Sequence, residues 1–263
     1  NDIAACGANP LGIMVTLLLP EGSDENMLKD LMEGIHNAAN EIGVEVLGGH
    51  SEITDAVVKP IISVTALGIA KKNEYVTSSG AKSGDDVIVT KALGLEGTAI
   101  LASDYEELLI KTIPVELLHR AKSFIEKIGA IEEGLVAAKV GASAMHDITE
   151  GGLLGAVYEV AEASGVGIKI IKDKLPILPE TKAICDFFQI DPLGLISSGS
   201  MLICTPKGNE VLEALASQGI NAYIIGKVTE KEKLLISEND CISILPPERD
   251  ELYTAIERVS FNL

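Results

Sequence analysis

The chain has 263 residues, 47% of them hydrophobic, which is enough to bury a core and to form one large or two modest domains. Its 39 acidic and 21 basic residues give a formal net charge of −18, which opposes binding to the phosphate backbone of a nucleic acid. The apolar runs at 13–19 and 57–70 are too short to cross a bilayer, so we expect a cytoplasmic protein that binds neither nucleic acid nor membrane.

The first part of the chain predicts strands and helices in alternation. The expected elements, in chain order, are a helix at 3–9, a strand at 12–19, a helix at 24–42, a short buried strand at 44–47 and a strand at 57–70. Because Pro60 lies near its start, the last of these strands is either covered on both faces or placed at a sheet edge.

Residues 75–86 are rich in Ser, Gly and Lys and mark a domain boundary, which gives an N-terminal domain at 1–76 and a C-terminal domain at 77–263. The alternation then begins again. The expected elements are strands at 85–90, 142–146, 167–171, 200–205, 220–228, 234–237 and 241–245, and helices at 95–104, within 114–140, and at 152–165, 179–188, 208–218 and 248–259. This order predicts a two-domain protein of the α/β or α+β class.

One segment places two acids and a hydroxyl directly before a helix that opens on paired glycines. Helix N-termini carry free N–H groups and a partial positive charge, and glycines let a bulky anion approach the backbone. A phosphate-type site is therefore one interpretation. An ordinary capped helix is the other, because aspartate and threonine are both good N-cap residues. The residues concerned are Asp147, Thr149, Glu150, Gly151 and Gly152.

Two earlier segments also carry acids beside small residues. Asp2, which follows Asn1 at the head of a small-residue helix, is a candidate metal ligand, with a plain helix cap as the alternative. After the strand at 44–47, two glycines leave the backbone open to a ligand, and a hydroxyl and a carboxylate offer oxygen atoms to phosphate or a cation. The histidine between them is a candidate proton carrier or simply a surface residue. This second segment is Gly48-Gly49-His50-Ser51-Glu52.

Lys91 lies where a predicted strand passes into a helix and is either a phosphate ligand or a solvated lysine. The spacing of a P-loop is absent around it. A polar turn at 196–200 either joins the same site or is only a serine-rich turn. The four cysteines are widely scattered without metal-ligand spacing, which is typical of a protein in a reducing cytosol.

Taken in order, these segments resemble the superfamily that includes aminoimidazole ribonucleotide (AIR) synthase, formylglycinamidine ribonucleotide amidotransferase, selenophosphate synthetase, thiamine-monophosphate kinase and the hydrogenase maturation factor HypE. The matching segments are 1–10, 48–52, 75–94, 147–153 and 196–200. Within the superfamily the chain most resembles the HypE group, judged by its Asn-Asp-Ile-Ala run and the segment 91–102.

The resemblance implies a PurM-like fold, with an N-terminal mixed-sheet domain that dimerises and a C-terminal α/β sandwich domain. The N-terminal domain is expected to lack its first segment. The resemblance also implies ATP bound with Mg²⁺ and activation of an amide or carboxamide oxygen by the γ-phosphate. The implied partners are therefore the nucleotide, a small-molecule or carboxamide substrate, and a second copy of the chain.

The resemblance also implies a role for each candidate residue. Metal ligands would be Asp2 and Glu52, and catalytic residues would be Asp147, Glu150 and His50. Residues that bind the cofactor would be Asn1, Gly48, Gly49, Ser51, Lys91, Thr149, Gly151 and Gly152.

The chain departs from the HypE pattern at two places. His50 stands where HypE-like proteins commonly have aspartate, and the chain ends in Ser-Phe-Asn-Leu, whereas HypE ends in the cysteine that carries the thiocarboxamide it dehydrates. If this end is genuine, HypE chemistry cannot run in its usual form. Two alternatives therefore stay open: a non-catalytic nucleotide-binding dimeric paralogue, and a small-molecule kinase of the thiamine-monophosphate kinase type.

Overall fold

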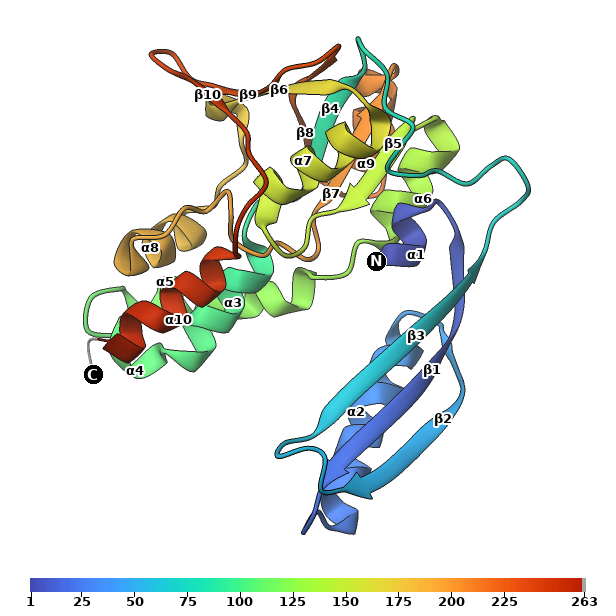
Figure 1. Ribbon diagram of the computed structural model, residues 1–263, viewed down its shortest axis with the longest axis vertical. Coiled ribbons are helices and arrows are strands. Elements are labelled where there is room, and N and C mark those ends of the chain that lie inside the picture. The colour runs from blue at the N-terminus through green and yellow to red at the C-terminus, as the bar shows by residue number, and fades with distance from the viewer. Residues whose placement is uncertain (262–263) are drawn as a thin grey trace. The chain divides into compact units, whose positions relative to one another are not determined.

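The computed structural model describes residues 1–261 (Figure 1). Its contacts divide the chain into two compact units. Unit 1 comprises Asn1–Gly7 and the chain from Asn73 onward, and unit 2 comprises Ala8–Lys72. Both units combine helices with a sheet, which confirms the predicted fold class. The domains predicted at 1–76 and 77–263 stay a prediction. No helix among the described residues is long and apolar enough to span a membrane.

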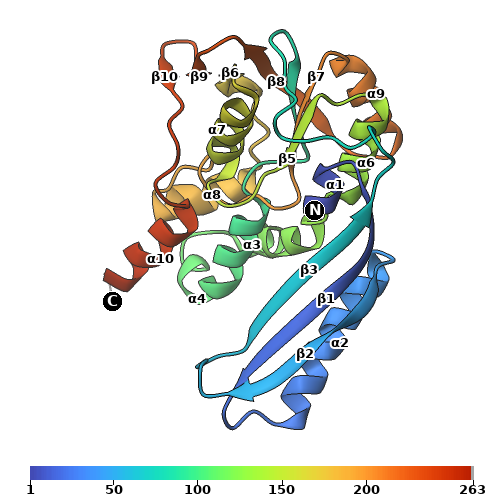
Figure 2. The same ribbon diagram turned by 45° about the vertical axis from the view of Figure 1, so that its right-hand side comes forward.

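Residues 8–72, all of which the structure describes, form a three-stranded mixed sheet with a helix alongside it (Figure 2). The strands lie in the order β2-β1-β3, with β2 parallel and β3 antiparallel to β1. Asp24 caps the helix, because its side chain accepts a hydrogen bond from Met27 N at 2.9 Å. The elements are β1 (Asn9–Pro20), α2 (Glu25–Glu41), β2 (Glu45–Thr54) and β3 (Ile61–Ile69).

The two faces of this sheet differ in burial along β1, whereas β3 is exposed on both faces. Successive side chains of a strand point to opposite faces, and Val15, Leu17 and Leu19 of β1 are all buried on one of them. On the other face, strand pairing places Met14 of β1 and Ile61, Leu67 and Ile69 of β3 together, each between 44% and 59% exposed, with a partly buried Leu18 beside Ile61. We call this second face the open face and define it by Met14, Ile61, Leu67 and Ile69.

All three strands of unit 2 differ from their predicted bounds. β1, predicted at 12–19, extends over Asn9–Pro20, because β3 pairs with it from Asn9 onward. β2 does not end at Leu47 but continues through Gly48 to Thr54, because β1 pairs with it along its whole length. β3 begins at Ile61, not at residue 57, since Pro60 has no N–H to donate to a neighbouring strand. Of the two predicted placements for β3, the sheet edge is the one observed.

Unit 1 is built on a mixed sheet in which the described strands lie in the order β10-β9-β6-β8-β4-β7-β5. β4 is antiparallel to both of its neighbours, β7 and β8. β4 and β7 are buried on both faces, which explains their continuous aliphatic sequences. The strands are β4 (Asp86–Thr90), β5 (Ala144–Asp147), β6 (Gly167–Ile171), β7 (Met201–Thr205), β8 (Ala222–Thr229), β9 (Lys233–Ile236) and β10 (Cys241–Ser243).

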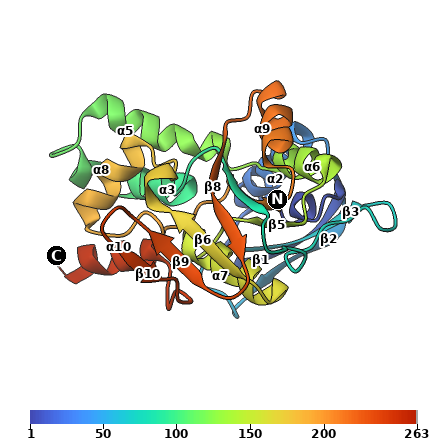
Figure 3. The same cartoon turned by 90° about the horizontal axis from the view of Figure 1, so that it is seen from above.

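Helices cover both faces of this sheet (Figure 3). On one face, Val87 and Val89 of β4 pack in a cluster with Val157 of α7 (Gly152–Ser164). On the other, Ile88 packs in a cluster with Leu215 of α9 (Gly208–Ser217) and with residues of α6 (Ile131–Val140). The alternation of side chains along β4 therefore produces the predicted layered arrangement.

A third apolar cluster is helical and lies beside the sheet layers. Leu101, Leu118, Ile184 and Ala255 are fully buried in it. The predicted helix at 248–259 begins only at Glu251, because Asp250 serves as its cap and accepts a hydrogen bond from Leu252 N at 2.8 Å. The helices concerned are α3 (Leu95–Asp104), α4 (Glu106–Leu109), α5 (Val115–Lys122), α8 (Pro179–Phe188) and α10 (Glu251–Phe261); 3₁₀ turns occupy Ser123–Lys127 and Lys172–Lys174.

Candidate functional site

Two segments far apart in the sequence bring candidate acids together in unit 1. Asp2 begins the short helix α1 (Asp2–Ala5), which packs against β5, and Asp147 is the last residue of β5. Asp147 is only 8% exposed, and this burial raises the pKa of its carboxyl group. The charge of Asp2 raises that pKa further, whereas the neighbouring His146 lowers it. The end of β5 is therefore a place of concentrated negative charge.

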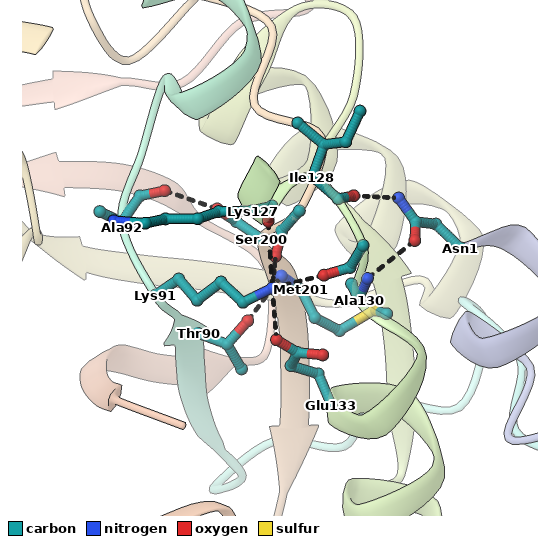
Figure 4. Close-up of polar contacts among 12 residues, drawn as sticks. Asn1, Thr90, Lys91, Ala92, Lys127, Ile128, Ala130, Glu133, Ser200 and Met201 are labelled. Atoms are coloured by element: carbon teal, nitrogen blue, oxygen red, sulfur yellow. Dashed lines mark hydrogen bonds and ion pairs between the residues drawn. The ribbon is translucent and has the colours of Figure 1, made fainter. Parts of the chain in front are cut away.

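The side chain of Asn1 is held by unit 1 itself (Figure 4). Its Nδ2 donates to Ile128 O at 2.8 Å, and its Oδ1 accepts from Ala130 N at 2.8 Å. These bonds fix α1 to the loop that precedes α6 and so set the position of Asp2. Cofactor binding by Asn1 stays a prediction.

Lys91 lies at the end of β4 with its ammonium group surrounded by oxygen atoms of unit 1 (Figure 4). Nζ donates to Lys127 O at 3.2 Å, to Gly199 O at 3.1 Å and to Gly129 O, and it is 2.7 Å from Glu133 Oε1. An ammonium has three donors, so these partners use all of them. Lys91 therefore ties the loop before α6 to the start of β7, and a role in phosphate binding would require it to leave partners it already has.

Sequence reasoning missed the residue in closest contact with this group of acids. His146 precedes Asp147 on β5, and its Nδ1 is 2.6 Å from Asp147 O and 3.9 Å from Asp147 Oδ1. Its Nε2 is 2.7 Å from Glu159 Oε2 on α7. The sequence held one signal for it, a histidine directly before the candidate acid in a short predicted strand.

The glycines at the start of α7 are required by the fold. Gly151 and Gly152 have φ angles of 82° and 59°, a region that favours glycine. A Cβ on Gly152 would lie 2.5 Å from Leu193 O, which leaves no room for a side chain. Gly151 N donates to Asp250 Oδ2 at 2.7 Å inside the protein. No local signal could have identified this partner, because Asp250 follows Gly151 by 99 residues.

Thr149 and Glu150 complete the turn between β5 and α7. Thr149 O accepts a hydrogen bond from Gly152 N at 3.0 Å, which closes the turn. Thr149 is partly buried and Glu150 is exposed, so the side chain of Glu150 is open to a ligand from solvent. The catalytic role of Glu150 and the cofactor contact of Thr149 stay predictions.

The remaining candidates belong to β2 in unit 2. His50 and Glu52 are two residues apart on one face of the strand, with Nε2 and Oε2 3.5 Å apart and side chains 66% and 57% exposed. Ser51 lies between them and points to the opposite face. Gly49 faces β1 closely, since a Cβ there would lie 1.8 Å from Val15 O, whereas one on Gly48 would meet nothing within 4 Å. Gly49 is thus required by strand pairing.

Two cavities of unit 1 lie outside this group of acids. One of about 760 Å³ is bounded by α3, α4, α8 and α10, with Tyr105, Phe187 and Arg258 in its wall, and contains none of the predicted site residues. The other, of about 620 Å³, includes Lys91 and Tyr223. Among residues 1–261, no group of three or more His, Cys, Asp or Glu side chains is placed to hold a metal ion.

Comparison with known proteins identifies two family models in the chain. The model described as AIR synthase related protein, C-terminal domain, matches residues 82–237, and the model for the N-terminal domain of the same family matches residues 1–70. Together they extend over both units.

Three curated relatives illustrate the range of similar proteins. A hydrogenase expression/formation protein of Methanocaldococcus jannaschii is 32% identical over 246 residues, which are 90% of this chain and 70% of the relative. Carbamoyl dehydratase HypE of Rhodobacter capsulatus is 27% identical over 86% of this chain and 66% of its own length. Thiamine-monophosphate kinase of Pyrococcus horikoshii is 32% identical over 94% and 74%. The chain thus spans about two thirds of the length of several curated relatives it matches.

Solved structures agree with the sequence relatives. E. coli HypE has a TM-score of 0.81 and 25% identity, with 97% of this chain and 79% of that chain covered. HypE in complex with ATP has a TM-score of 0.76 and 20% identity, with 96% and 78% covered. These matches confirm the predicted PurM-like arrangement of a mixed-sheet domain and an α/β sandwich domain.

Proposed function

The chain belongs to the AIR synthase related protein family, and we propose that it is an ATP-dependent enzyme that activates a carboxamide oxygen with the γ-phosphate of ATP. The approach of Asp2 and Asp147 in unit 1 carries this proposal. The two acids are separated by most of the chain, yet the charge of one raises the pKa of the other. A buried acid whose pKa is raised by burial and by a second, exposed acid is a pattern that is enriched at functional sites.

The proposed reaction converts a carboxamide and ATP into a nitrile, ADP and phosphate. The γ-phosphoryl group passes to the carboxamide oxygen, and ADP leaves. Loss of the two N–H protons and departure of the phosphate then form the carbon–nitrogen triple bond. In this scheme Asp147 accepts a proton from nitrogen, and Glu150 and His50 are the further candidates for proton transfer.

The residues of unit 1 suit a magnesium ion bound together with a nucleotide. Mg²⁺ is usually held by one or two carboxylates plus phosphate oxygens, so a larger cluster of protein ligands is not required. The negative charge shared by Asp2 and Asp147 is of the kind that a divalent cation neutralises. We propose Asp2 as a magnesium ligand of unit 1. In unit 2, taken by itself, Glu52 stays the candidate ligand. The ion would neutralise charge on the phosphates during transfer.

Each unit, taken by itself, carries backbone and side-chain groups that are candidates for nucleotide binding. In unit 2 the candidates are on β2, where Gly48 leaves its surroundings open to a ligand and Ser51 offers a hydroxyl. In unit 1 they are Asn1, Lys91 and the turn from Thr149 to Gly152. ATP in the solved HypE complex supports nucleotide binding by this fold.

Titration calorimetry of the full-length protein with ATP, in the presence and absence of Mg²⁺, tests the binding part of the proposal. We expect heat that depends on Mg²⁺ and that D2N weakens. Asp104→Asn, a change of an exposed acid on α3, is the matched control. No ATP binding, or equal binding without Mg²⁺, would contradict the proposal.

Product analysis with a panel of carboxamide acceptors tests the reaction. We expect ADP, phosphate and a nitrile in equal amounts, and loss of all three in D147N. Binding of ATP without turnover on any acceptor favours a non-catalytic paralogue.

A small-molecule kinase is the second candidate, favoured by the 32% identity with thiamine-monophosphate kinase over 94% of this chain. The same product analysis separates the two. A kinase yields an acceptor that retains the phosphoryl group, and phosphate release does not accompany ADP formation.

We also propose that the protein forms a homodimer through the open face of unit 2. The four side chains that define this face are 44% to 59% exposed, a cost that burial against a second copy would remove. L67E should therefore give a monomer in sedimentation analysis. Val58→Glu is the control, because Val58 is 94% exposed in the turn between β2 and β3 and should not change the mass.

A further inference from the structure

His146 lies between two groups that can only accept hydrogen bonds. Its Nδ1 is 2.6 Å from the main-chain oxygen of Asp147, and its Nε2 is 2.7 Å from Glu159 Oε2. A carbonyl oxygen has no proton to donate. The carboxylate of Glu159, which is 61% exposed, likewise accepts only.

A neutral imidazole satisfies only one of these two contacts. It carries one N–H and one bare nitrogen, so the bare nitrogen would face an oxygen lone pair at hydrogen-bond distance. The imidazolium form has an N–H on each nitrogen and satisfies both contacts. The geometry around His146 is therefore that of a cation.

The charge of this cation falls beside the candidate acids. Nδ1 of His146 is 3.9 Å from Asp147 Oδ1, and the Asp147 side chain is largely buried. Asp2 is the other acid acting on Asp147. A positive ring fixed at this distance offsets the repulsion between Asp2 and Asp147.

We propose that His146, held as an imidazolium by Glu159 and the Asp147 carbonyl, is a positioning residue that keeps the Asp147 carboxylate ionised and oriented at the start of the α7 turn. The inference rests on the proposed function, in which Asp147 accepts a proton from the carboxamide nitrogen. His146 itself transfers no proton in this scheme. Glu159 contributes by fixing the ring.

NMR spectroscopy of the full-length protein with ¹⁵N-labelled histidine tests the charge of the ring without any substrate. The chain has four histidines, and His146 is assigned by the signal that H146Q removes. We expect both ring nitrogens of His146 to be protonated at pH 7.5, and the doubly protonated fraction to fall in E159A. Glu162→Ala is the matched control, because Glu162 lies on the same helix and contacts Lys233 with Nζ and Oε1 2.5 Å apart.

ATP turnover with the best carboxamide acceptor tests the positioning role. H146Q should lower kcat about 10- to 100-fold, the usual loss when a group that orients a site residue is removed, with little change in the KM for ATP. H146R keeps a positive charge and donors for both oxygens, and it should restore most of the rate. Circular dichroism and the melting temperature establish that each variant is folded.

Each outcome bears on one of the two proposals. A neutral His146 ring in the wild-type protein, or a protonated ring that E159A leaves unchanged, overturns the inference. So does a folded H146R that is as slow as H146Q. If no carboxamide acceptor supports ATP turnover by the wild-type protein, the proposed function fails. The NMR result still decides whether His146 is held as a cation.

Discussion

Units 1 and 2 place their candidate residues in opposite surroundings. In unit 1, Asp147 is 8% exposed, and the groups around it are fixed by contacts from distant parts of the chain, such as Asn1 with Ile128. In unit 2, His50 and Glu52 lie with side chains 66% and 57% exposed on β2, which is an edge strand of the described sheet and pairs there with β1. Substitutions in unit 1 should therefore change stability and activity together, whereas most substitutions on β2 should affect ligand binding alone.

The strongest exception to this contrast should be Gly49 in unit 2. G49A places a Cβ 1.8 Å from Val15 O, and neither strand can move away without losing the β1–β2 pairing. We expect a loss of more than about 3 kcal/mol in the free energy of unfolding, at the upper end of overpacking effects. Urea denaturation followed by circular dichroism measures it.

Gly48→Ala is the matched control for this change. A Cβ at Gly48 meets nothing within 4 Å, so only backbone conformation contributes to its cost. If the two alanine variants are equally stable, strand pairing does not explain the glycine at position 49.

The next largest effect should be at Gly152 in unit 1. G152A combines a φ of 59° with a Cβ 2.5 Å from Leu193 O, so we expect a loss of about 2–3 kcal/mol from strain and close contact together. Gly165→Ala at the other end of α7 has a similar φ of 66° but open space, and it should cost only about 1 kcal/mol. Thermal unfolding of the two alanine variants isolates the cost of the contact with Leu193 O. Equal melting temperatures would show that this contact does not destabilise G152A.

Removal of the Asp147 charge should have a smaller effect on stability, with the opposite sign. The pKa of Asp147 is raised in the folded protein, mainly by burial, so the folded state binds its proton more tightly than the unfolded state does. The wild-type protein therefore loses stability as pH rises from the unfolded value of 3.8 through the folded pKa. D147N avoids this loss.

Melting temperatures measured at several pH values check this sign. D147N should melt above the wild type at pH 7, and the difference should shrink towards pH 3, where both states are protonated. At the same time D147N should lose catalytic activity. A wild-type protein that is the more stable of the two at pH 7 would contradict the burial argument.

The sequence predicted the fold more completely than the site. Periodicity located α3 at its observed bounds, Leu95–Asp104, because its helical pattern is bounded by Gly94 and an acidic end. It did not extend β2 past Leu47, because glycines usually end strands and the pairing partner β1 is not visible locally. The acid-rich segments were recognised as such. The partners of two site residues carry no local signal: Asp250 accepts the hydrogen bond of Gly151 N, and Glu133 forms an ion pair with Lys91.

The last prediction concerns the reactivity of the cysteines, where we expect the smallest effect. It compares buried with exposed thiols and so tests how tightly unit 1 is packed. Burial raises the pKa values of the Cys185 and Cys204 thiols to about 12, whereas Cys6 and Cys241 are exposed. At pH 8 a thiol with that pKa is ionised in only about one molecule in 10,000, and the thiolate is the reactive form. A disulfide reagent should therefore label Cys6 and Cys241 in the native protein and reach the other two only after unfolding. Native labelling of Cys204 would show that the sheet of unit 1 opens under conditions in which its candidate acids are supposed to stay buried, so the test reports on the rigidity that the whole contrast requires.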